Sequence, residues 1–245
     1  MSFRTTTGRA LALATACATV LVATGCSALS AEATPTDGAP FTGASATLAT
    51  LDTIPVKGRA PKTGYDRDLY GPAWTDDVGV AGGHNGCDTR NDILRRDLTA
   101  VTYKTGTRDC VVLTGTLADP YTGKTVDFVR GQNTSSAVQI DHVVALSDSW
   151  QKGAQKLDAQ TRKDFANDPR NLLASDGPAN QQKSDSDAAS WLPANKAFRC
   201  AYVAKQVEVK AAYRLWVTQA EKDAIVGVLA TCPDPVATGS SAGSS

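Results

Sequence analysis

The stretch Gln139-Ile140-Asp141-His142-Val143-Val144-Ala145-Leu146 decides the fold, because a charged pair interrupts an otherwise apolar run. Burying a carboxylate beside an imidazole is costly unless each group finds a partner. Asp141 and His142 therefore either belong to a local hydrogen-bond network or hold a cation. The rest of the chain can be interpreted from this pair.

Two further polar motifs follow in a fixed order. The stretch Asp-Pro-Arg-Asn-Leu-Leu contains Asn171, and Asn-Gln-Gln-Lys-Ser-Asp contains Asn180 and Lys183. The order Asp-His, then Asn, then Asn-x-x-Lys resembles the HNH nucleases of the ββα-metal class. It is most similar to the extracellular branch that shares its domain with the C-terminal part of GmrSD-type restriction enzymes. The resemblance extends from Tyr65 to Cys232, and it departs from the simplest HNH pattern at the third position, where Asn replaces His, and at Ala145, where Pro is frequent.

The N-terminus is typical of an exported protein. Residues 1–25 are expected to form a signal peptide, since two arginines precede an uncharged apolar run that is too short to span a bilayer comfortably. Residues 22–26 also resemble a bacterial lipobox, which would place a lipid on Cys26 and anchor the protein to the cell surface. The alternative is secretion after cleavage near residues 28–30.

Composition divides the remainder into one domain and two flanking segments. Residues 26–54 are rich in Ala, Thr, Ser, Gly and Pro, which predicts a disordered tether, and residues 236–245 are expected to form a disordered tail. The domain between them, 55–235, has about 180 residues, which is ample for a hydrophobic core.

The sequence contains six cysteines. Assigning Cys17 and Cys26 to export leaves a set that predicts two disulfides in an exported chain: Cys87, Cys110, Cys200 and Cys232. Three pairings exist, and joining each cysteine to its neighbour closes the shortest loops. A zinc site made by the same thiolates is the alternative, but the sequence has no Cys-x-x-Cys pair.

The pattern of apolar and turn residues predicts an α+β fold. The expected elements are a helix capped by Asp88 or Thr89, hairpin strands over 110–117 and 125–130, a strand over 138–144, helices over 147–150 and 159–165, a returning strand over 171–174, and helices over 179–191, over 195–215 and from Thr218. The resemblance implies that the strands over 138–144 and 171–174 and the helix over 179–191 form the ββα-metal (His-Me finger) core. Adjacent side chains on a flat strand point to opposite faces, so we expect a local distortion at Asp141 and His142.

The resemblance also assigns chemical roles. It implies that His142 is the general base and that Asn171 braces the loop and orients it. Asp141 and Asn180 would supply oxygen ligands to one divalent cation, Mg²⁺ or alternatively Mn²⁺.

Three cationic residues are candidates for binding phosphate. Lys183 lies one helical turn beyond Asn180 and projects from the same face, and Arg130 and Arg170 are the other two. The second histidine, His84, lies in a glycine-rich loop and is expected at the surface.

The formal net charge is zero. A broad basic surface for gripping nucleic acid is therefore not expected, although a site that holds one or two phosphates is compatible with it. The sequence predicts a monomeric, exported, metal-dependent endonuclease that cleaves DNA, or alternatively RNA, with little sequence preference. The alternative is a non-catalytic surface lipoprotein that binds a ligand in the same cleft. A zinc hydrolase of another class is not favoured, because a chain with only two histidines has too few ligands for a catalytic zinc ion.

Overall fold

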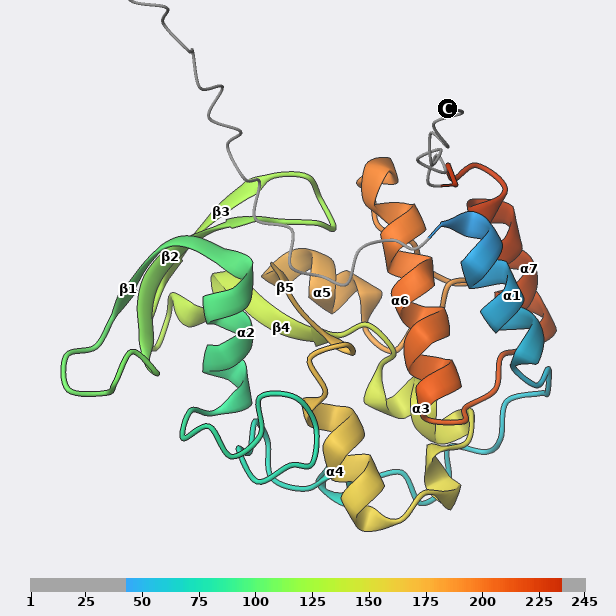
Figure 1. Ribbon diagram of the computed structural model, residues 1–245, viewed down its shortest axis with the longest axis horizontal. Coiled ribbons are helices and arrows are strands. Elements are labelled where there is room, and N and C mark those ends of the chain that lie inside the picture. Colours follow the sequence, from blue (N-terminus) through green and yellow to red (C-terminus); the bar gives the residue numbers. More distant parts are fainter. Residues whose placement is uncertain (1–42, 235–245) are drawn as a thin grey trace, which may run out of the picture. The chain divides into compact units, whose positions relative to one another are not determined.

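The computed structural model describes residues 43–234 (Figure 1). The signal peptide, the lipidation site Cys26, most of the tether and the C-terminal tail lie outside the described residues. No helix between residues 43 and 234 is long and apolar enough to cross a bilayer. The fold is mixed α+β, as expected, with two small antiparallel sheets and a group of C-terminal helices.

The first helix, α1 (Ala44–Thr53), lies in a stretch that was expected to belong to the disordered tether. That prediction is wrong for these residues. Leu51 is fully buried and Ala44 nearly so, and α1 lies beside α6 and α7 (Figure 1). The average composition of the segment concealed an apolar stripe at helical spacing, formed by Ala44, Leu48 and Leu51.

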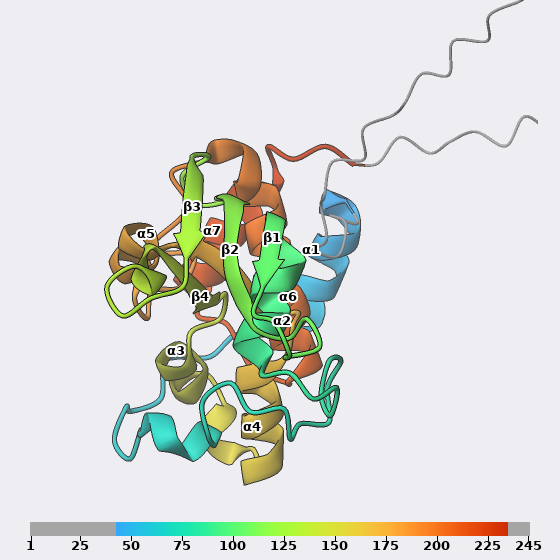
Figure 2. The same ribbon diagram turned by 90° about the vertical axis from the view of Figure 1, so that its left-hand side faces the viewer.

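The first sheet contains β1 (Leu98–Tyr103), β2 (Val112–Ala118) and β3 (Thr125–Val129), side by side in that order (Figure 2). The expected hairpin is confirmed as the antiparallel pair of β2 and β3. Strand β1 was not expected, and it follows directly after the helix that was predicted before the hairpin. That helix, α2 (Thr89–Asp97), is capped as predicted by Asp88, whose side chain accepts from the Asn91 amide at 2.9 Å.

The second sheet positions the candidate site. Strand β4 (Val138–His142) pairs with β5 (Leu172–Asp176), and α3 (Leu146–Gln151) and α4 (Ala159–Asn167) lie between them in the sequence. Helix α5 (Gly177–Lys183) follows β5 and is shorter than expected. The pairing is regular through Asp141 and His142, so the predicted distortion is wrong. The two side chains point to opposite faces of the strand, as the pleat requires.

The C-terminal helices are α6 (Arg199–Ala212) and α7 (Gln219–Leu229). Thr218 caps α7 as expected, accepting from the Glu221 amide at 3.1 Å. Residues 43–234 also contain four short 3-10 helices: η1 (Arg67–Tyr70), η2 (Ser135–Ala137), η3 (Ala154–Lys156) and η4 (Lys196–Phe198).

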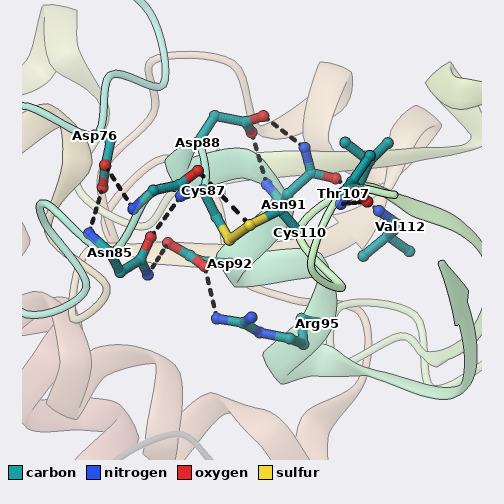
Figure 3. Close-up of a disulfide and its surroundings, with 12 residues drawn as sticks. Asp76, Asn85, Cys87, Asp88, Asn91, Asp92, Arg95, Thr107, Cys110 and Val112 are labelled. Carbon is teal, nitrogen blue, oxygen red and sulfur yellow. Dashed lines mark hydrogen bonds and ion pairs between the residues drawn. A yellow bond between two sulfur atoms is a disulfide. The ribbon is translucent and has the colours of Figure 1, made fainter. Parts of the chain in front are cut away.

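The neighbour pairing of the cysteines is confirmed. Cys87 is bonded to Cys110 and Cys200 to Cys232. Figure 3 shows the first disulfide beside the start of α2, where Asn85 donates to Asp92 at 2.9 Å. The second joins the first turn of α6 to the segment after α7. The first bond therefore fixes the chain at the start of α2, and the second links the ends of α6 and α7.

A buried ionic cluster supports α3, the helix that follows the candidate site. The Lys152 ammonium lies 2.8 Å from Asp148, 2.7 Å from Asp187 and 2.7 Å from Glu221. Lys210 of α6 contacts Glu221 at 2.6 Å. These side chains are almost completely buried, and each charge has an opposite charge beside it. Arg59 contacts Asp148 at 3.1 Å and Asp187 at 2.7 Å, so three cations balance three carboxylates in a cluster that ties α3, α6 and α7 together.

Candidate functional site

His142, the last residue of β4, lies in a cleft at the junction of the second sheet, α5 and the segment that precedes α2. The cleft is lined by groups from separated parts of the sequence, among them Arg67, Trp74, Asp141, His142 and Asn180. Of the residues expected to form the site, the structure thus brings His142, Asp141 and Asn180 to one cleft.

The imidazole of His142 is held on two sides. Its Nε2 lies 2.8 Å from the carbonyl oxygen of Ala166, and its ring is stacked on Trp74 at 5.6 Å between centroids. Because a carbonyl can only accept, Nε2 carries the proton and Nδ1 keeps a lone pair. Burial lowers the pKa of His142 to about 3, so the ring is neutral at neutral pH. A neutral, oriented imidazole at the edge of a cleft can act as a proton acceptor.

Asn171 is fully buried and braces the backbone around His142. Its Oδ1 accepts from the Val144 amide at 2.8 Å, and its Nδ2 donates to the carbonyl of Phe165 at 3.4 Å. Phe165 precedes Ala166, whose carbonyl holds the His142 ring. Asn171 therefore connects the loop after His142 to the end of α4 that orients the imidazole.

Asp141 faces the interior rather than open solvent. Its Oδ1 accepts from the Lys183 ammonium at 2.9 Å, and its Oδ2 accepts from the Tyr121 hydroxyl at 2.5 Å. Burial raises the pKa of Asp141 above its usual value, an effect that Lys183 and Tyr121 oppose. The contact of Tyr121 with Asp141 joins positions that are too far apart in the sequence to be predicted from a local pattern.

Lys183 is completely buried, so the phosphate-binding role expected of it is not supported. In addition to Asp141, its ammonium donates to the carbonyl of His142 at 2.9 Å. These contacts tie α5 to the end of β4. The position of Lys183 one turn after Asn180 suggested a shared exposed face, but α5 turns this residue toward the core.

Asp141 and Asn180 both line the cleft, and their side-chain oxygens are of the kind that a hydrated Mg²⁺ ion takes as ligands. A carboxylate offers about four lone-pair positions, and Asp141 uses its oxygens for one contact each. Asn180 donates through Nδ2 to Gln139 at 2.9 Å, and its side-chain Oδ1 makes no hydrogen bond within residues 43–234. A cation must nevertheless share Asp141 with the Lys183 ammonium. No group of three or more His, Cys, Asp or Glu side chains in the described part of the chain could hold a metal ion.

The other expected phosphate-binding residues lie outside the cleft. Arg130 donates to the Val112 carbonyl and to the Asn91 side chain in the first sheet, each at 2.5 Å. Arg170 is paired with Asp168 at 2.6 Å. The cationic side chains that do line the cleft are Lys62, Arg67 and Arg90, of which Lys62 and Arg67 were not predicted. The positions of these two residues depend on the path of the segment before α2, for which no local pattern in the sequence is a guide.

Comparison with known proteins adds the family. The family described as "GmrSD restriction endonucleases, C-terminal domain" matches residues 88–228, which include Asp141, His142, Asn171 and Asn180. A relative from Arthroderma benhamiae named "Uncharacterized secreted protein" is 36% identical over 191 residues, which cover 77% of this chain and 86% of the relative. No solved structure matches. The family match covers more than half of the sequence and contains the polar residues gathered around the cleft, and the chain therefore belongs to the GmrSD restriction endonuclease C-terminal domain family.

Proposed function

We propose that this protein is an exported endonuclease that hydrolyses phosphodiester bonds of DNA, with RNA as an alternative substrate. The observation that carries the proposal is the neutral imidazole of His142, fixed by Ala166 and Trp74 in a cleft that Asp141 and Asn180 also line. Family membership supports a nuclease, and both disulfides and the name of the secreted relative support export. In this proposal β4, β5 and α5 form the ββα-metal core.

His142 would accept a proton from the attacking water at Nδ1. An anionic phosphate entering the cleft raises the pKa of the imidazole toward the working pH, which makes the ring a better base when substrate is bound. The Ala166 carbonyl accepts from Nε2 and stabilises the imidazolium that forms. Asn171 acts through the backbone as a positioning residue, because its contacts fix Val144 and Phe165.

Asp141 and Asn180 would hold one divalent cation, Mg²⁺ or alternatively Mn²⁺. When bound, such a cation neutralises charge on the phosphate and assists the leaving oxygen. Lys183 and Tyr121 keep the buried Asp141 in place by hydrogen bonds to both carboxylate oxygens. The family supports this assignment, since HNH-type nucleases are generally metal-dependent.

We also propose that the protein acts as a monomer outside the cytoplasm. A lipid on Cys26, with release by simple secretion as the alternative, remains part of this proposal, although the comparisons give the anchor no support. Labelling with a radioactive fatty acid, compared between the native sequence and Cys26→Ser, decides between the two. Retention of label by the variant contradicts lipidation at this residue.

The second candidate function is non-catalytic binding of a ligand in the same cleft. It is favoured by the Asp141–Lys183 pair, because an ammonium already neutralises the carboxylate that a metal would use. This candidate predicts that no nucleic acid is cleaved with any divalent cation.

Digestion of plasmid DNA and of RNA with Mg²⁺, Mn²⁺, Ca²⁺ or Zn²⁺, or with EDTA, tests the proposal. We expect cleavage with Mg²⁺ or Mn²⁺, none in EDTA, and none by His142→Ala. His84→Ala is the matched control, since His84 is the other histidine and its side chain is 68% exposed. Melting curves and thiol titration show whether each variant is folded with its disulfides intact. Undiminished cleavage by folded His142→Ala contradicts the assigned base.

A further inference from the structure

The cationic side chains that line the cleft differ in the hydrogen bonds and ion pairs that they make with other residues. Lys62 lies 3.2 Å from Asp185 and sits over the ring of Tyr65. Arg90 donates to the carbonyl of Val138 at 3.0 Å and to that of Ser135 at 3.3 Å. The guanidinium of Arg67, by contrast, makes no hydrogen bond or ion pair with any residue in the described range 43–234, and the residue is exposed. Among the described residues, Arg67 is thus the cation of this cleft whose guanidinium has no partner.

The backbone beneath Arg67 is well anchored. Arg67 begins η1, and the last residue of that helix, Tyr70, is buried and contacts α3. Its hydroxyl donates to the Leu146 carbonyl at 2.9 Å and lies 2.7 Å from the Ser149 hydroxyl. Because α3 follows directly after the strand that ends in His142, η1 is held to the same support as the imidazole.

Arg67 also lies beside the candidate base. It lines the cleft together with His142 and lines the adjoining pocket in which Trp74 and His142 form part of the wall. Its charge is one of the influences that lower the pKa of His142, although burial contributes most. A group bound to the guanidinium would therefore be close to the imidazole.

Arg67, like Trp74, lies before residues 88–228, the region that matches the family. A guanidinium presents several N–H donors in a planar fork that matches two oxygens of a phosphate. Lys183 could have supplied such a charge but is buried against Asp141.

We propose that Arg67 binds the phosphate of the nucleic-acid substrate beside His142. This inference rests on the proposed nuclease function and names the contact that holds the scissile phosphodiester. In a chain with no net charge, one free guanidinium at the site gives local attraction without a broad basic surface.

The first measurement is kcat/KM for a short labelled oligonucleotide. We expect Arg67→Gln to lower it by about 10- to 100-fold, since a hydrogen-bonded contact to a charged group is lost. Arg67→Lys keeps the charge but not the fork and should lie in between. Arg214→Gln is the matched control, because Arg214 is an exposed arginine outside the cleft, and it should leave kcat/KM unchanged.

The second measurement is the salt dependence of binding, made by fluorescence anisotropy with a single-stranded oligonucleotide in EDTA. Losing one phosphate contact should reduce the slope of log K against log salt by about 0.7. A merely structural role for Arg67 would not change this slope. We expect the reduction in Arg67→Gln and not in Arg67→Lys or Arg214→Gln.

The two hypotheses fail in different ways. Unchanged kcat/KM and an unchanged salt slope in folded Arg67→Gln overturn the Arg67 assignment while leaving the nuclease intact. Absence of cleavage by the native protein under every metal condition overturns the proposed function, and the salt slope then still decides whether Arg67 contacts phosphate. If Arg67→Gln melts early, Arg67→Lys replaces it: a lower kcat/KM with the native salt slope supports the contact, whereas an unchanged kcat/KM or a reduced salt slope in the folded lysine variant contradicts it.

Discussion

Lys183 and Asp141 form a buried ion pair, with Nζ 2.9 Å from Oδ1 and the lysine side chain completely shielded from solvent. The pair joins α5 to β4, the two elements that carry the oxygen ligands proposed for the cation. Its contribution can be separated from that of surface ion pairs by mutation.

Replacing Lys183 with Met should destabilise the protein by about 3–5 kcal/mol, because Asp141 is left buried without a counter-charge. Urea unfolding measures the change. Lys222→Met is the matched control: its ammonium lies 2.8 Å from Asp52, but the Asp52 side chain is 71% exposed, so the loss should be about 0–1 kcal/mol. Adding Asp141→Asn to Lys183→Met should recover part of the stability. Equal losses in the two single lysine variants would contradict the importance of burial.

The buried His142 should make stability depend on pH. Its pKa in the folded state, about 3, lies below that of the unfolded chain, so the unfolded state binds the extra proton first as the pH falls. The stability contributed by a neutral His142 is complete at neutral pH. It declines between about pH 6.5 and 3, by at most about 1.4 kcal/mol per pH unit.

Urea unfolding at pH 7 and pH 4.5 tests this dependence by comparing the native protein with His142→Asn. The variant should lose less stability on acidification, because it has no imidazole to protonate. His84→Asn should behave as the native protein does, since His84 is largely exposed. An identical loss in native protein and His142→Asn would refute the linkage.

Asn171→Ala should reduce both stability and turnover. The substitution leaves the Val144 amide without its side-chain acceptor, which costs about 1–3 kcal/mol for a buried donor. Because the loop that positions His142 loosens, we expect kcat to fall while KM changes little. Asn133→Ala is the control, as Asn133 is exposed and lies outside the cleft. A rise in KM alone would point to substrate binding by Asn171 instead.

Removing the Cys200–Cys232 disulfide by replacing both residues with Ser should cost about 3–4 kcal/mol, from the loss of loop closure in the unfolded chain. The bond spans a sequence separation of 32 and holds α6 to the end of α7, away from the cleft. Guanidinium unfolding should therefore shift, whereas kcat/KM measured well below the transition should not. Loss of activity in the folded double variant would show that these helices act on the site.

Local features of the sequence predicted much of the fold. Asp88, Asp158 and Thr218 each begin a helix, because a short polar side chain satisfies an amide of the first turn. The turn between β2 and β3 was evident from its residues, and short loops predicted the disulfides. In contrast, β1 was missed because Leu98 continues the apolar face of α2 before the chain turns into the sheet.

Only the site residues that belong to the short sequence motifs were predicted. The order Asp-His, Asn, Asn led to a shared cleft for Asp141, His142 and Asn180. The contacts of Trp74 with His142 and of Tyr121 with Asp141 join distant parts of the chain. Such contacts depend on tertiary packing, which no periodic pattern encodes. Packing also places the Lys183 side chain in the core, whereas its spacing of one helical turn from Asn180 had predicted that it faces the cleft.

One wall of the cleft comes from the segment that carries Arg67 and Trp74, upstream of the region shared with the family. Homologues that keep residues 88–228 but differ in this segment would retain the imidazole and its brace with another wall opposite them. The chemistry of that wall can therefore change in evolution without a change in the residues that hold the imidazole.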